Sequence, residues 1–154
     1  MGLDVILVAV DFSEVSARVY EVAAELAQRM QARLVLLNVT EPQVDLVGMA
    51  PPQAYASAEE EIQKIAQARL HAVREQLEAR GVNVLTEHEW GPVVGSILDR
   101  AQKHHAGLVV IGSHGHGMVY NLIVGSVAEG VLKHSKVPVL VVPAKPAESK
   151  DSDD

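Results

Sequence analysis

The chain contains no cysteine among its 154 residues. It therefore cannot form disulfide bonds or a thiolate metal site. Lys and Arg are also in deficit, 13 against 20 Asp and Glu, which gives a formal net charge of -7. Contact with nucleic-acid backbone or with an anionic membrane surface needs clustered basic residues. We therefore expect a cytoplasmic protein that binds neither nucleic acid nor membrane.

Long hydrophobic runs are missing as well. The first apolar run, VILVAV at residues 5–10, ends at Asp11 and is much too short to cross a bilayer. No basic segment precedes it, as a secretory signal would require. The length of the chain fits one domain with a core of ordinary size.

Short apolar runs alternate with helical patterns along the whole chain. Continuous apolar runs are typical of strands buried in a parallel sheet, and they predict strands at residues 5–10, 33–39, 108–112 and 137–143. Residues 82–90 alternate toward their end, which predicts a strand nearer a sheet edge. Between them, helices are expected at about 13–30, 57–80, 92–106 and 126–134. This alternation predicts a single-domain α/β fold with a parallel sheet over residues 1–143. The polar segment 144–154 is expected to be a disordered tail.

Capping residues set the expected helix starts. Ser13 is the expected N-cap of the first helix, and Pro92 is expected in the first turn of the third. Ser57 with Glu60, and Ser126 with Glu129, have the spacing of capping boxes for the second and fourth helices. A long loop is accordingly expected at residues 41–57.

A glycine-rich stretch follows the fourth expected strand. Residues 111–132 hold five glycines and two histidines but no Lys or Arg. Ligands of doubly wound sheets bind beyond the carboxyl ends of the strands, where Asp11, Val39 and Gly112 also fall. The stretch is either a loose connector or a cradle of backbone N–H groups for phosphate, and spacing alone leaves both open.

Sharper motifs are absent from this stretch. No Lys follows its glycines as a P-loop requires, and the first strand-to-helix turn, VAVDFSE, has no glycine for a dinucleotide fingerprint. His114 and His116 could face one side as metal ligands, but no third ligand is evident, so no metal site is predicted. No general base is evident either, and we expect no catalytic residues.

The spacing Gly112-x-x-Gly115, then nine residues, then Gly125-Ser126 resembles the ATP-binding signature of the universal stress protein family. The segments VAVDFSE, LVVIGSHG, GSVAEGVL and VPVLVVP match that family too. The resemblance spans residues 5–142. It implies a Rossmann-like, open five-stranded parallel sheet in the order 3-2-1-4-5, with helices on both faces. It also implies an ATP-binding regulatory module of the stress response.

Site residues follow from the resemblance by position. Asp11 and the backbone of Val10 would contact adenine and ribose, and Val39 would pack on the adenine. Ile111 and Gly112 would border the ribose. The phosphates would be held by the remaining members of the signature, namely Gly115, Gly125, Ser126 and Val127. For Asp11, a purely structural role as a helix-start carboxylate is the alternative.

The chain departs from the family in its lack of basic residues, because Tyr120 and Asn121 stand where members often carry further basic side chains. His116 stands where members often carry Arg or Lys, so either this histidine or Mg²⁺ would have to offset the charge of ATP, or the ligand would be ADP or AMP. The family resemblance and the apolar last strand also imply a homodimer through residues 139–142 (Val139, Leu140, Val141, Val142). The alternative function is a dimeric interaction protein of the same fold that does not depend on nucleotide.

Overall fold

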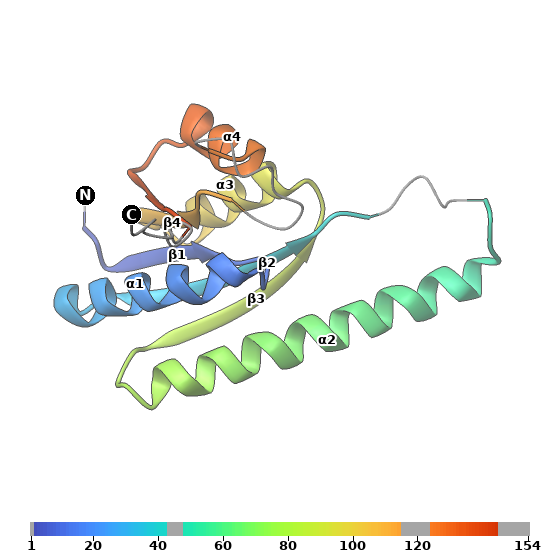
Figure 1. Cartoon of the computed structure of the whole chain (residues 1–154), viewed down its shortest axis with the longest axis horizontal. Coiled ribbons are helices and arrows are strands. Elements are labelled where there is room, and N and C mark those ends of the chain that lie inside the picture. The colour runs from blue at the N-terminus through green and yellow to red at the C-terminus, as the bar shows by residue number, and fades with distance from the viewer. Residues whose placement is uncertain (1, 43–47, 115–123, 145–154) are drawn as a thin grey trace, which may run out of the picture.

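The computed structural model describes residues 2–42, 48–114 and 124–144. Strands and helices alternate as expected (Figure 1). The elements in chain order are β1 (Val5–Ala9), α1 (Glu14–Met30), β2 (Arg33–Thr40), α2 (Pro52–Glu78), β3 (Val84–Trp90), α3 (Val93–Lys103), β4 (Leu108–Gly112), α4 (Ser126–His134) and β5 (Val139–Val142).

All five strands form one sheet in the order β3-β2-β1-β4-β5, and every neighbouring pair is parallel. Leu7 in the central strand lies opposite Val35 of β2 and Val109 of β4. This order confirms the expected topology. The winding of the chain reverses between β1 and β4, so the carboxyl ends of these two strands border a crevice.

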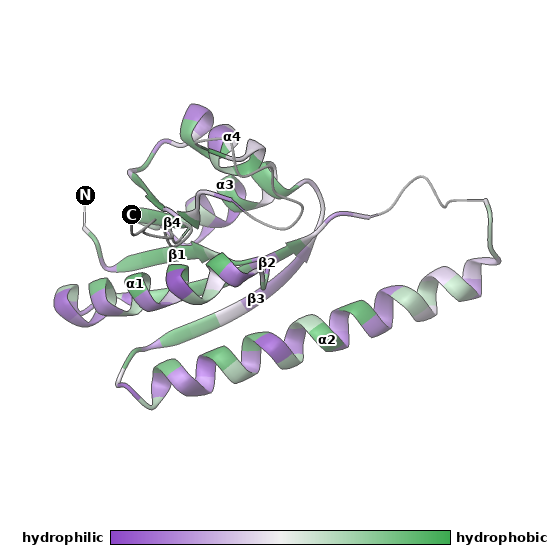
Figure 2. Cartoon of the chain, viewed as in Figure 1, coloured by the Kyte–Doolittle hydropathy of each residue, from purple (hydrophilic) through white to green (hydrophobic). Residues whose placement is uncertain are grey.

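The sheet is covered by helices on both faces, α1 and α2 on one and α3 and α4 on the other (Figure 1). Alternate residues of β1 supply both cores: Ile6 and Val8 pack toward α1, whereas Leu7 packs toward α3 and α4. All three side chains are fully buried. Successive residues of β1 are apolar, as its green colour in Figure 2 shows, because the strand is buried on both faces of the sheet.

The start of the second helix differs from the sequence prediction. The second helix begins at Pro52 with Pro51 as its N-cap, so Ser57 and Glu60 lie inside it and are not a capping box. Pro51 and Pro52 favour this start because proline is tolerated in a first helical turn and its φ is already helical. The loop expected at 41–57 is correspondingly shorter.

The fourth helix has the predicted bounds, Ser126–His134, but not the predicted capping box. Its N-cap is Gly125, which makes no side-chain cap hydrogen bond, and Ser126 is the first helical residue. Glu129 pairs with Lys133 one turn later at 2.8 Å. Ser13 and Pro92 do occupy the N-cap positions of α1 and α3, but neither side chain makes a cap hydrogen bond.

The first half of α2 extends past the sheet (Figure 1). Ala66, Leu70 and Leu77 of its apolar stripe are buried, whereas Ile62 and Ile65 remain 42% and 45% exposed. Within the described part of the chain, no helix is both long and apolar enough to cross a membrane.

Candidate functional site

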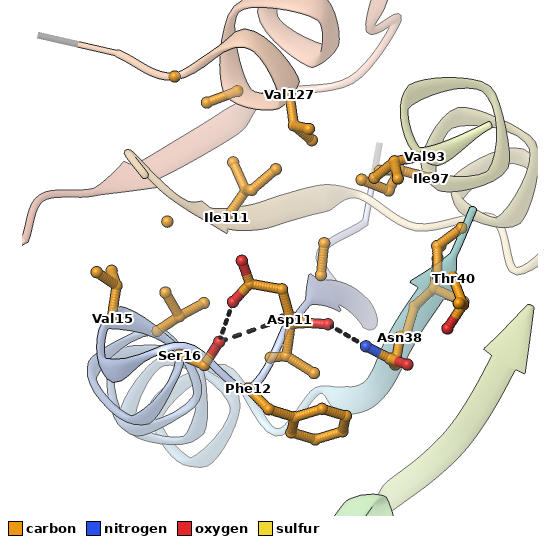
Figure 3. A pocket seen from close by; sticks show the side chains of 18 of the residues that line it. Asp11, Phe12, Val15, Ser16, Asn38, Thr40, Val93, Ile97, Ile111 and Val127 are labelled. Carbon is orange, nitrogen blue, oxygen red and sulfur yellow. Dashed lines mark hydrogen bonds between the residues drawn. The ribbon is translucent and has the colours of Figure 1, made fainter. Parts of the chain in front are cut away.

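A cavity of about 910 Å³ opens at the carboxyl ends of the strands. All four helices contribute to its walls, and side chains from α1, α3 and α4 are labelled in Figure 3. Of the ten site residues that the sequence predicted, Gly115 and His116 lie outside the described residues. The structure brings the other eight together around this cavity: Val10, Asp11, Val39, Ile111, Gly112, Gly125, Ser126 and Val127.

Asp11 lies at the centre of the cavity, just beyond β1 (Figure 3). One carboxylate oxygen, Oδ1, accepts hydrogen bonds from the Ser13 backbone N–H and the Ser16 hydroxyl, both at 2.9 Å. These contacts tie the carboxylate to the start of α1, where the Ser13 side chain makes no cap hydrogen bond. Asp11 thus has the structural role that sequence reasoning held open, and the same bonds fix its carboxylate inside the cavity.

Asn38 holds the end of β1 against β2. Its side-chain N–H donates to the Val10 carbonyl at 2.9 Å, and only 6% of the residue is exposed. Sequence reasoning missed this cavity residue. The available signal was a single amide inside the otherwise apolar run LVLLNV, because a buried polar side chain in such a strand needs a partner.

Gly112 marks a close approach between β4 and α1. A Cβ atom at this position would lie 3.0 Å from Val15 Cγ1 and 3.1 Å from the His114 carbonyl oxygen. Val19 of α1 is almost as near, at 3.3 Å. The absence of a side chain at Gly112 therefore lets α1 pack directly over the end of β4 beside the cavity.

The fourth helix points its N-terminus at the cavity. Its N-cap Gly125 is held by a 2.6 Å hydrogen bond from its N–H to the Ser113 carbonyl. The next residues, Ser126 and Val127, also line the cavity. Backbone N–H groups in a first helical turn have no partner within the helix, and the helix dipole is positive there. This end of the cavity is suited to an anion.

The opposite walls are apolar. Ile111 of β4 and Val127 of α4 face the same space as Val93 and Ile97 of α3 (Figure 3). Val39 at the end of β2 also lines this space. A cavity with apolar walls and a few placed polar groups is typical of small-molecule sites. These walls could accept a flat, weakly polar ring next to the anion-binding end.

The cavity is also lined by a positively charged side chain from α2, a helix that the sequence did not connect with the site. Among the described residues that line the cavity, Arg69 of α2 is the one Lys or Arg. Its guanidinium carbon lies 5.5 Å from the centre of the Phe12 ring. Phe12 has a left-handed backbone with φ of 59°, which is uncommon for a bulky residue. No local pattern pairs two residues so far apart in sequence, so this contact could not be predicted.

Ionisable groups near the cavity are few. Glu41 accepts a hydrogen bond from the Val93 N–H at 3.3 Å, at the start of α3. Beyond the lining, His88 of β3 bonds the Thr40 hydroxyl at 3.0 Å, and burial lowers its pKa despite the opposing charge of Glu89. Within the described ranges, no group of three or more His, Asp or Glu side chains could hold a metal ion.

Comparison with known proteins places these features in a family context. The model of the Universal stress protein family matches residues 2–143. The universal stress protein YxiE of Bacillus subtilis is 31% identical over 142 residues, covering 88% of this chain and 96% of that protein. A universal stress protein of Methanocaldococcus jannaschii is 30% identical over 137 residues, covering 89% of this chain and 80% of that one.

Solved structures share the fold. The universal stress protein UspA from Lactobacillus plantarum is similar with a TM-score of 0.80 at 24% identity, over 92% of this chain and 99% of that chain. A universal stress protein in complex with cAMP has a TM-score of 0.67 at 22% identity, over 93% and 98%. One from Archaeoglobus fulgidus in complex with dAMP has a TM-score of 0.62 at 22% identity, over 92% and 98%.

Proposed function

Since the chain belongs to the universal stress protein family, we propose that it is an adenine-nucleotide-binding regulatory protein of the stress response. The observation that carries this proposal is the cavity itself. One space brings together apolar walls, the fixed carboxylate of Asp11 and the N-terminus of α4. These are the three environments that a base, a ribose and a phosphate require.

The proposed binding mode assigns each part of the nucleotide to one region. The adenine packs against Val39, and the Asp11 carboxylate and the Val10 backbone contact the adenine and ribose. Ile111 and Gly112 border the ribose. The phosphates lie at Gly125, Ser126 and Val127, and the proposal extends this end to Gly115 and His116.

Ligands of two proteins of this fold support the assignment of an adenine nucleotide. Universal stress proteins have been crystallised with cAMP and with dAMP. We propose ATP as the ligand of this chain, with Mg²⁺ or His116 offsetting the charge of its phosphates. If neither offsets that charge, the ligand is AMP or ADP. The role is regulatory and not enzymatic, and the protein acts in the cytoplasm.

Calorimetric titration of the nucleotide-free protein with ATP, ADP and AMP tests the proposal. We expect saturable binding of at least one of them, and its loss in Gly115→Val, because the side chain would block the approach of the phosphate to the backbone. Gly95→Ala in α3, which does not line the cavity, is the matched control and should bind as wild type does. Absence of binding by the wild-type protein would leave the nucleotide-independent dimer as the function.

The pH dependence of binding separates the two sources of counter-charge. If His116 faces the phosphates, bound phosphate favours its protonated form, so ATP affinity should rise as the pH falls from about 8 toward 6. His116→Ala should flatten this dependence, and His116→Arg should raise affinity at pH 8. Equal profiles for wild type and His116→Ala would assign the counter-charge to Mg²⁺, which repeating the titrations without the metal would confirm.

A further inference from the structure

Ser113 is the junction between the last strand and the anion-binding end of the cavity. Its backbone N–H donates to the Val142 carbonyl at 2.8 Å, and its own carbonyl accepts from Gly125 at 2.6 Å. Its hydroxyl oxygen lies 3.2 Å from the Ala144 backbone nitrogen and 2.9 Å from His114 Nδ1. Only 4% of the residue is exposed. Every polar atom of this buried serine therefore has a hydrogen-bond partner within the protein.

The direction of the hydroxyl bonds follows from their partners. A backbone N–H can only donate, so the Ser113 oxygen accepts from Ala144. The hydroxyl hydrogen then has one remaining partner among the contacts of Ser113, which is His114 Nδ1. Leaving that hydrogen without an acceptor in a buried place would cost free energy. His114 Nδ1 is accordingly the acceptor, and the neutral imidazole carries its proton on Nε2.

The ring of His114 lies near the α4 end of the cavity. A Cβ atom on Gly125 would lie 4.0 Å from His114 Cδ2, the ring carbon bonded to Nε2. Cδ2 of the imidazole therefore lies near the N-cap of α4, while Nδ1 lies against the Ser113 hydroxyl. His114 also lines the cavity beside Gly125 and Ser126.

We propose that Ser113 is a positioning residue for phosphate: its hydroxyl holds His114 in the Nε2–H tautomer and so adds an uncharged N–H donor to those of the α4 N-terminus. The other tautomer would place a lone pair of Nε2 toward the phosphate oxygens and repel them. This inference rests on the proposed nucleotide binding. It assigns a role to a serine that follows the signature glycine and is not itself one of the proposed nucleotide contacts.

Nitrogen NMR of the imidazole tests the tautomer without any ligand. Long-range proton–nitrogen spectra of the nucleotide-free protein should show His114 with a protonated Nε2 and an unprotonated Nδ1, assigned by the signal lost in His114→Gln. In Ser113→Ala, the His114 nitrogen resonances should move, because the hydrogen bond to Nδ1 is gone. A protonated Nδ1 in the wild type, or unchanged His114 resonances in Ser113→Ala, would overturn the proposal whatever nucleotide does.

A double-mutant cycle then tests the effect on phosphate. Ser113→Ala should weaken ATP binding roughly three- to tenfold, the range of one hydrogen bond, while adenosine binding stays unchanged. His114→Gln has no tautomers and carries an amide N–H near the position of Nε2, so adding Ser113→Ala to it should cause no further loss. Equal losses from Ser113→Ala in both backgrounds, or an equal loss for adenosine, would show a structural role for Ser113 alone. If wild type binds neither ATP nor adenosine, the proposed function fails and the NMR result still stands.

Discussion

At the scale of residues, Asp11 shows how one side chain can serve fold and site together. Its carboxylate accepts hydrogen bonds from the Ser13 N–H and the Ser16 hydroxyl at the start of α1, and the same two bonds hold it at the cavity. A carboxylate in the first strand-to-helix turn could be predicted to lie at a site from its position after a buried strand. Its partners could not, because Ser13 was expected to cap the helix with its own side chain.

Gly112 gives a residue-scale test of the packing between α1 and β4. Gly112→Ala should lower the free energy of unfolding by about 1–3 kcal/mol, since the new Cβ would lie too close to Val15 and to the His114 carbonyl. Denaturant unfolding followed by circular dichroism measures this change.

Gly95→Ala is the matched control for that substitution. Gly95 lies inside α3, and the nearest atom to an added Cβ is 3.6 Å away. Replacing glycine by alanine in a helix with room for the methyl group should stabilise the protein by about 0.5–1 kcal/mol. A stable Gly112→Ala variant would contradict the close approach seen in the structure.

The role of a residue could be predicted where it depended on neighbouring positions in the sequence. Val39 and Ile111 could be placed at the site because they end apolar runs. Ser113 and Arg69 could not, since their importance lies in partners 31 and 57 positions away in the chain. For Asn38, the sequence signalled a buried amide but not its partner, 28 positions away. A sequence pattern records such contacts only indirectly.

At the scale of elements, the strands were predicted well and the helix starts less well. Burial on both faces leaves a short continuous apolar run of largely β-branched and Leu residues in β1, β2 and β4. A capping box spans only four residues and occurs inside helices by chance, as Ser57 and Glu60 show. For α2, the proline pair at residues 51 and 52 was the stronger signal.

The two halves of α2 should differ in stability. No residue of the helix before Ala66 is buried, whereas Ala66, Leu70 and Leu77 pack into the core. Helical turns without packing are marginal in water. Hydrogen exchange followed by mass spectrometry should therefore show amides of residues 54–62 exchanging roughly tenfold or more faster than those of 66–77. Uniform protection along α2 would mean that another surface covers its first half.

The edge strand β3 carries a pH-dependent contribution to stability. Burial lowers the pKa of His88, with the charge of Glu89 opposing the shift. Because the folded pKa lies below the unfolded one, the contribution of His88 is intact above the unfolded value near ~6.5 and is lost as the pH falls. The unfolding free energy should decrease more between pH 7 and 5.5 in wild type than in His88→Gln. Parallel curves for the two proteins would rule out this contribution.

At the scale of the whole molecule, the sheet order places β5 at an edge. Leu140 in this strand is 36% exposed, and the strand carries no charge. An apolar, uncharged edge tends to pair with another chain. The proposed homodimer would use this edge through residues 139–142, with Pro138 and Pro143 limiting the length of the pairing.

Light scattering coupled to gel filtration tests the dimer. The wild-type protein should be a dimer at micromolar concentration, and Val141→Asp should give monomers or insoluble protein because a buried charge would enter the interface. A wild-type monomer under these conditions would remove the dimer proposal. The topology itself would be unaffected, since it rests on pairings within one chain.

The central claim is that an adenine nucleotide occupies the cavity at the carboxyl ends of β1, β2 and β4. Titration of ¹⁵N-labelled, nucleotide-free protein with ATP, followed by proton–nitrogen correlation spectra, tests this claim most directly. We predict the largest shifts of the backbone amides at residues 10–11, 39–40, 111–114 and 125–127, all of which line the cavity. Unchanged spectra at saturating ATP, or shifts confined to residues away from these strand ends, would contradict the account.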